Sequence, residues 1–238
     1  MLSQTLAAAE TVDRIVSREW NMFHTVNEGG ARAACQDDRV TFDGMRRGQF
    51  DAWSQEAAES YLGDLEDAER SGRNLVSEKY IHMMRTTEPS KYEQLLSQIE
   101  KPSESARALA GELSDKLLAQ TEALFEKYPY VAGSGRPLRS AHDFGGVVSV
   151  ETYQLGELLT YSARTLDALL RHVLALESEG VSFAGRVLEN SAAFYGYKNL
   201  DEAETAAKER ADGMEFELTY GCASCDSCNP AMCAERRA

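Results

Sequence analysis

Apolar residues recur every three or four positions through most of this 238-residue chain, and this spacing constrains its fold more than any other feature. Residues at that spacing lie along one side of an α-helix. The clearest stripe lies within residues 47–68 and consists of Phe50, Trp53, Ala57, Tyr61, Leu65 and Ala68. Runs of Val, Ile and Thr that would favour strands are scarce. The pattern predicts an all-α fold, a bundle of long antiparallel helices.

Capping residues and prolines divide the pattern into separate helices. Ser3 and Asn199 are suited to N-cap positions, and Pro89 and Pro102 end helices because proline cannot continue the backbone hydrogen-bond ladder. By residue number, the expected helices are 3–22, 47–68, one between 72 and 89, 90–99, 103–128, 149–179, 181–194 and 200–211. Residues 128–146 hold several glycines and two prolines, and a loop of that length is often functional.

Four of the five cysteines gather near the C-terminal end, with the spacing C-x2-C-x2-C-x4-C. They are Cys222, Cys225, Cys228 and Cys233. Gaps of two residues bring successive sulfurs round one small centre, and the first three cysteines match the start of the ferredoxin run C-x2-C-x2-C-x3-C-P. We therefore expect an iron–sulfur cluster of the 4Fe–4S type. It would be held by a metal-binding tail, residues 214–238, packed on a helical domain of residues 1–213.

Zinc is the alternative metal for this tail, because zinc also takes four thiolates. Zinc sites usually split their ligands into two pairs with a long spacer, and the spacer is missing here. A thiol-rich tail without metal is the third interpretation. A disulfide framework is not favoured, because the cysteines lie at one end of a long chain that carries no secretory signal.

The segment from residue 19 to residue 53 mixes large aromatic residues with many kinds of polar residue. Its candidate catalytic residues are Glu19, His24, Cys35 and Arg46. Buried polar groups need specific partners, and active sites need several functional groups close together. We therefore expect the segment to line a pocket together with the loop 130–146. The plainer interpretation is a salt bridge between Glu19 and Arg46, with Cys35 as a small core residue.

Further candidates lie in the loop and in the helices beside it. Arg136 and His142 are candidates for binding an anionic ligand or cofactor, although the loop could equally be held by its own hydrogen bonds. Tyr153, close to Glu157, is a candidate for acid–base chemistry. Glu78 and His82 are one helical turn apart and are expected to form a solvated salt bridge, as the chain lacks the Glu-x-x-His pairs of di-iron bundles.

Several short motifs occur in the segment from residue 19 to residue 53. They are Glu19-Trp20-Asn21-Met22-Phe23, Gly29-Gly30, Cys35-Gln36, and Met45-Arg46 followed by Gln49, Phe50 and Trp53. They resemble the motifs of an uncharacterised bacterial domain family that is common in anaerobes. The resemblance continues through residues 72–80 and 149–159, so it covers most of the chain. It implies a full-length soluble module and lends no activity.

The charge balance narrows the range of partners. Asp and Glu number 39 against 25 Lys and Arg, and the resulting net charge of −14 repels naked nucleic acid and anionic lipid. No apolar run approaches the roughly 18 residues of a membrane span, and no basic, apolar leader opens the chain. These features favour a cytoplasmic protein without nucleic-acid or membrane partners.

Two functions remain open from the sequence. The first is an iron–sulfur oxidoreductase or cluster-dependent lyase, with a small-molecule substrate in a helical pocket or a redox partner protein. The second is a non-catalytic helical module in which a structural four-cysteine zinc site fixes the tail and the surface binds a protein partner.

Overall fold

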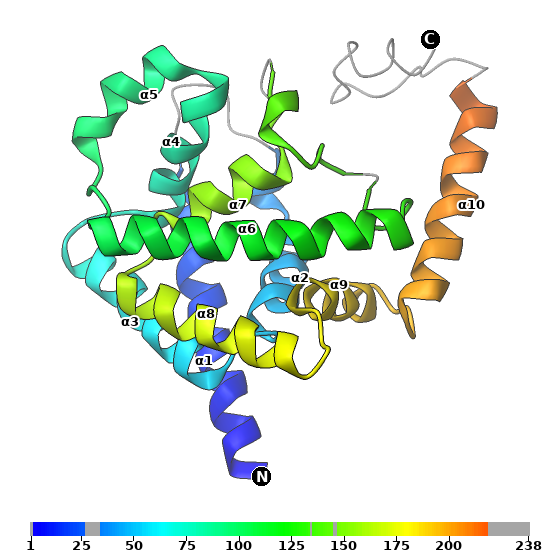
Figure 1. Cartoon of the computed structure of the whole chain (residues 1–238), viewed down its shortest axis with the longest axis horizontal. Coiled ribbons are helices and arrows are strands. Elements are labelled where there is room, and N and C mark those ends of the chain that lie inside the picture. Colours follow the sequence, from blue (N-terminus) through cyan, green and yellow to red (C-terminus); the bar gives the residue numbers. More distant parts are fainter. Residues whose placement is uncertain (1, 27–33, 134, 145–146, 219–238) are drawn as a thin grey trace.

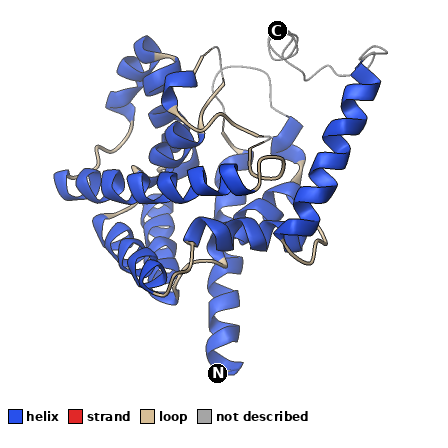
Figure 2. Ribbon diagram, turned by 45° about the vertical axis from the view of Figure 1, so that its right-hand side comes forward, coloured by secondary structure: helices blue, strands red, loops and turns tan. Residues whose placement is uncertain are grey.

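The computed structural model describes residues 2–26, 34–133, 135–144 and 147–218 (Figure 1). In these ranges the chain forms ten α-helices and no β-strand, which confirms the all-α prediction (Figure 2). The α-helices are α1 Leu2–His24, α2 Arg39–Phe50, α3 Gln55–Arg70, α4 Leu75–Thr87, α5 Pro89–Leu95, α6 Glu104–Lys127, α7 Val150–Leu158, α8 Ala163–Ser178, α9 Phe183–Phe194 and α10 Leu200–Leu218. The tail cysteines and Gly29-Gly30 lie outside the described residues.

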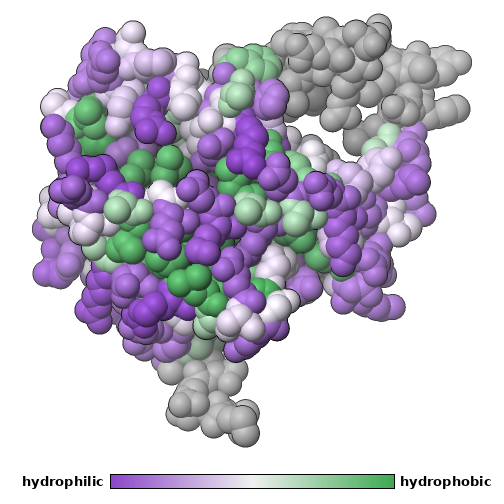
Figure 3. Space-filling model, in the orientation of Figure 1, coloured by the Kyte–Doolittle hydropathy of each residue, from purple (hydrophilic) through white to green (hydrophobic). Residues whose placement is uncertain are grey.

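The helices pack as a bundle whose members cross at different angles. Helix α1 contacts α2, α3 and α4, while α6 contacts α7, α8 and α9. Helix α6 lies across the direction of α1 in both ribbon views, so the helices do not all run antiparallel (Figures 1 and 2). On the face shown in Figure 3, hydrophilic residues cover most of the described surface.

The main core joins α1, α3, α6 and α8. Its fully buried side chains include Ile15, Leu65, Leu113, Leu166 and Val173. Each such side chain contributes about 1.5–3 kcal/mol when it is withdrawn from water. A smaller cluster of Tyr128, Ala192, Leu200 and Ala203 fixes the start of α10 against the end of α6 and α9. The expected domain boundary after residue 213 falls inside α10.

Residues 47–68, expected as one helix, form parts of two. Helix α2 ends at Phe50, and α3 begins after Ser54, whose side chain accepts a hydrogen bond from Ala57 N. The apolar spacing continues across the break because the rings of Phe50 and Trp53 both pack on Tyr61, with centroids 5.4 and 5.7 Å from it. Because residues on both sides of the turn pack into one core, the apolar spacing in the sequence does not indicate where the backbone turns.

Residues 149–179, expected as the longest helix, also form two. Ser149 caps α7, and Ser162 caps α8 by accepting a hydrogen bond from Thr165 N at 3.2 Å. The turn between α7 and α8 places Thr160 and Tyr161 beside the end of α7. The remaining expected helices coincide with α1, α4, α5, α6, α9 and α10, apart from their ends.

Candidate functional site

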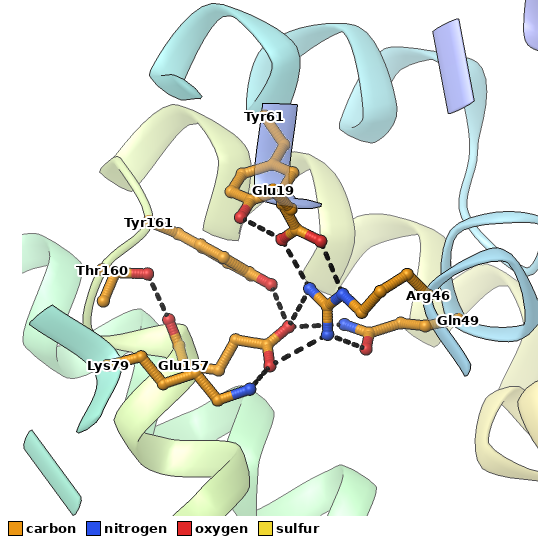
Figure 4. Close-up of polar contacts among 8 residues, drawn as sticks. All are labelled: Glu19, Arg46, Gln49, Tyr61, Lys79, Glu157, Thr160 and Tyr161. Atoms are coloured by element: carbon orange, nitrogen blue, oxygen red, sulfur yellow. Dashed lines mark hydrogen bonds and ion pairs between the residues drawn. The ribbon is translucent and has the colours of Figure 1, made fainter. Parts of the chain in front are cut away.

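Four helices each contribute one buried charged side chain to a single cluster. Glu19 comes from α1, Arg46 from α2, Lys79 from α4 and Glu157 from α7 (Figure 4). Their exposed fractions are only 2%, 8%, 7% and 6%, respectively. Charges at such depth are stable only when they are paired and hydrogen-bonded. We call these residues the four-charge network.

The guanidinium of Arg46 joins the two carboxylates. Its Nε and Nη2 donate to Glu19 Oε2 and Oε1 at 2.5 and 2.6 Å, which is a bidentate pair. The same Nη2 donates to Glu157 Oε1 at 3.0 Å. Lys79 Nζ donates to the other oxygen of Glu157. The network thus alternates in charge from Glu19 to Lys79, and its two negative charges balance its two positive ones.

Neutral donors complete the shell around both carboxylates. The hydroxyl groups of Tyr61 and Tyr161 donate to Glu19 and Glu157, each at 2.6 Å. Gln49 donates to Glu157 at 2.8 Å and accepts from Arg46 Nη1 at 2.9 Å. The carboxylate oxygens therefore have little capacity left to accept a proton from a substrate.

Burial and neighbouring charges shift the pKa values of several of these groups. Burial acts to raise the pKa of Glu157, but Arg46 and Lys79 outweigh it and hold that pKa well below its ordinary value. Burial, reinforced by the nearby carboxylates, raises the pKa of both Tyr61 and Tyr161 well above 10. At neutral pH Glu157 is therefore charged and both phenols are neutral donors, an arrangement that suits binding better than proton transfer.

A pocket of about 250 Å³ opens directly over this network. Liquid water takes about 30 Å³ per molecule, so the pocket has room for roughly eight waters or one small organic molecule. All four residues of the network line it, and Phe23, Phe42, Leu75 and Val76 supply apolar wall. Exposed residues, among them Cys35, Asp38 and Thr41, surround its mouth.

Two cations meet at the ring of Tyr153, which also lines the pocket. Lys79 Nζ lies 3.5 Å from the ring centroid, and Arg136 Cζ lies 4.7 Å from it. Cations at these distances are attracted by the negative face of an aromatic ring. Arg136 Nη1 also donates to the carbonyl of Val148 at 3.0 Å, which fixes this arginine to the segment that leads into α7.

Comparison with known protein families matches residues 9–205 to the family DUF4125, described as proteins of unknown function. The chain belongs to the DUF4125 family. This confirms the resemblance to an uncharacterised domain family. The matched residues of this DUF4125 protein include the whole pocket, whereas the four tail cysteines lie beyond them. Neither a curated protein nor a solved structure matches the chain.

The DUF4125 fold brings most of the candidate residues of the helical domain together. Glu19, Cys35, Arg46, Arg136 and Tyr153 all line the pocket, and Glu19 and Arg46 form the salt bridge that the plainer interpretation expected. Cys35 is exposed, so its interpretation as a core residue is wrong. A catalytic role for any of these residues stays a prediction.

Both candidate histidines lie apart from this group. His24 Nδ1 lies 3.1 Å from the carbonyl oxygen of Gln36, and His142 is exposed in the short 3-10 helix Ser140–His142. Neither lines the pocket of the DUF4125 domain. Asp143, next to His142, accepts hydrogen bonds from Ser149 N and Thr152 Oγ1. This part of the loop is therefore held by its own hydrogen bonds.

The expected salt bridge between Glu78 and His82 does not form. Glu78 is buried and instead accepts two hydrogen bonds from Arg73, at 2.8 and 2.6 Å. His82 is only 5% exposed, and neither ring nitrogen has a hydrogen-bond partner among the described residues. Burial, with a further contribution from Arg85, lowers the pKa of His82 from 6.5 to about 4.

Sequence reasoning missed Lys79, Tyr61, Tyr161, Gln49 and the central role of Glu157. One signal was available, because Lys79 stands four residues after Leu75 and four before Met83, in the buried stripe of α4. A lysine in such a stripe needs a buried partner.

In the part of the chain that the structure describes, no group of three or more His, Cys, Asp or Glu side chains is arranged to hold a metal ion. Cys222, Cys225, Cys228 and Cys233 lie outside the described residues. The described helices also include none with the length and apolar character needed to cross a membrane.

Proposed function

We propose that this protein binds a small organic molecule in the pocket between α1, α2, α4 and α7. The observation that carries the proposal is the position of the four-charge network at the base of an open cavity. Buried ion pairs seldom stabilise a fold more than apolar side chains of similar volume would, so stability alone is a weak reason for this network. Apolar walls around a few converging polar groups are typical of ligand sites.

The network has a defined part in such binding. Glu157 holds the ammonium of Lys79 in one position, and the ammonium has three donors, of which Glu157 uses one. Because the surrounding carboxylates and phenols are locked by hydrogen bonds, no reorganisation is needed when a polar group of the ligand arrives. The aromatic and aliphatic walls then supply most of the contact area.

A variant that fills the pocket tests this proposal. Val76→Phe adds a ring to the wall and is expected to abolish the binding of one-ring fragments, measured by ligand-observed NMR on the full chain. Ile81→Phe makes a similar change on the same helix, outside the pocket lining, and should keep the binding. The proposal fails if no fragment binds the natural protein, or if Val76→Phe binds the same fragments while its circular dichroism and melting temperature are unchanged.

We further propose that the four tail cysteines hold one metal centre, a 4Fe–4S cluster rather than zinc. The support is their spacing, which matches the start of the ferredoxin run. Such a cluster would pass electrons to the molecule in the pocket or polarise it, as an oxidoreductase or a lyase requires. If the metal is zinc, the tail is structural, and the module binds a protein partner without catalysis.

Elemental analysis of anaerobically purified protein distinguishes these alternatives. Iron and sulfide near four per chain, with a brown colour, are expected of the cluster. Cys225→Ser should remove both the metal and the colour while the helices stay folded, and Cys35→Ser, which changes the cysteine at the pocket mouth, should keep them. Colourless protein with one zinc per chain would contradict the cluster and support the structural zinc site. Full metal content in Cys225→Ser would exclude a centre shared by the four cysteines.

A further inference from the structure

The positive charges around the pocket are not equally matched by negative ones. Arg46 is bound by two carboxylates, and Lys79 is bound by Glu157. Arg136 is different, because within the described ranges it has no ion pair with a carboxylate. Its recorded contacts there are the carbonyl of Val148 and the ring of Tyr153. Arg136 therefore brings to the pocket lining an exposed positive charge that no described carboxylate pairs with.

The carboxylates that line the pocket are already engaged. Glu19 and Glu157 belong to the network, and Asp38 caps α2 by accepting a hydrogen bond from Thr41 N at 3.0 Å. The side chains of Asp38 and Arg136 are both exposed, so solvent screens the charge of each. None of the three is held in an ion pair with Arg136.

The position of Arg136 suits an anion at one end of the pocket. Its guanidinium lies over Tyr153, and Lys79 Nζ lies over the same ring, so two cations converge on this end. Arginine has five N–H donors in a planar fork that matches a carboxylate, and Val148 occupies only one nitrogen. The same lining includes apolar side chains, among them Phe42 and Val76.

We infer that the pocket takes a small organic carboxylate. The carboxylate lies at Arg136, beside Tyr153, and the apolar body of the molecule packs against Phe42 and Val76. The volume of about 250 Å³ limits that body to about the size of one aromatic ring. This inference rests on the proposed binding function and adds the charge and the orientation of the ligand.

Three probes that share one ring test the charge. Benzoate, benzyl alcohol and benzylamine are titrated into the full chain at low ionic strength, and binding is followed by NMR. We expect benzoate to bind about tenfold more tightly than benzyl alcohol, and benzylamine to bind most weakly. Arg136→Gln should lower the affinity for benzoate about tenfold and leave that for benzyl alcohol unchanged.

The matched control is Arg139→Gln, because Arg139 is an exposed arginine three residues further on that pairs with Glu122 and does not line the pocket. It should bind all three probes as the natural protein does. If the three probes bind equally and Val76→Phe removes them all, the pocket binds ligands but the charge assignment is wrong. If benzylamine binds best, or if Arg136→Gln leaves the affinity for benzoate unchanged, the inference is also overturned. If none of the three binds, the proposed function fails with it.

Discussion

Replacing Arg46 with methionine is expected to lower the free energy of unfolding by about 3–5 kcal/mol. The substitution keeps an unbranched side chain, but it removes the guanidinium, which lies over the ring of Phe50 and is shared by Glu19 and Glu157. Lys79 then remains as the only cation of the network, and Glu19 is left buried without an opposite charge. Urea unfolding at pH 7, followed by circular dichroism, measures the loss.

The neighbouring arginine provides the control for this substitution. Arg47 pairs with Asp13 at 2.5 Å, and the two side chains are 40% and 57% exposed. Arg47→Met should therefore cost about 1 kcal/mol or less, as exposed ion pairs usually do. Equal losses in the two variants would mean that the four-charge network is not formed as described.

Replacing His82 with leucine is expected to flatten the dependence of stability on pH between about 6.5 and 4. In the folded protein the pKa of His82 is about 4, against 6.5 for an ordinary histidine, so the folded state favours the neutral ring. Between these values the unfolded chain binds a proton that the folded chain does not. The free energy of unfolding therefore falls as the pH falls from 6.5 towards 4, by about 3 kcal/mol in total.

His82→Leu removes this proton-binding difference and also removes two ring nitrogens that have no partner among the described residues. The variant should gain stability over the natural protein as the pH falls from 7.5 to 4.5, in urea unfolding experiments at each pH. Any loss of stability that follows protonation of Glu157 is the same in both proteins. The difference between their free energies of unfolding therefore reports on His82 alone. His142→Leu, which changes an exposed histidine, should keep the acid response of the natural protein. A gap between natural protein and His82→Leu that is constant with pH would show that His82 is not held neutral.

The apolar spacing correctly predicted the all-α class, but it did not predict the turns between α2 and α3 and between α7 and α8. Both turns end at a serine that caps the next helix, Ser54 before α3 and Ser162 before α8. The apolar stripe runs through each turn without interruption, because residues on both sides pack into the same core. The capping serines indicate where the second helix of each pair begins, whereas the apolar spacing on which the prediction was based does not.

Several residues of the pocket lining were predictable from the sequence, but most contacts between distant residues were not. Glu19, Cys35 and Arg46 fall in one stretch of mixed chemistry, and the fold does place them around one pocket. Their partners lie far along the chain, since Arg46 and Glu157 are 111 residues apart. A contact between residues so far apart in the sequence depends on how α2, α4 and α7 pack together. The spacing of residues within each helix does not determine that packing. The two candidate histidines lie outside this pocket lining, and a function for either stays a prediction.

The position of a bound ligand in a crystal would show whether the pocket between α1, α2, α4 and α7 is the binding site. Crystals of the full chain would be soaked with 4-bromobenzoate, and the bromine would be located from its anomalous scattering. We expect a bromine peak inside the pocket, near Phe42 and Val76, and the carboxylate of the ligand beside Arg136. Arg46 should still join Glu19 to Glu157. The proposed site would be contradicted if the pocket is open to solvent in the crystal and bromine is found only outside it.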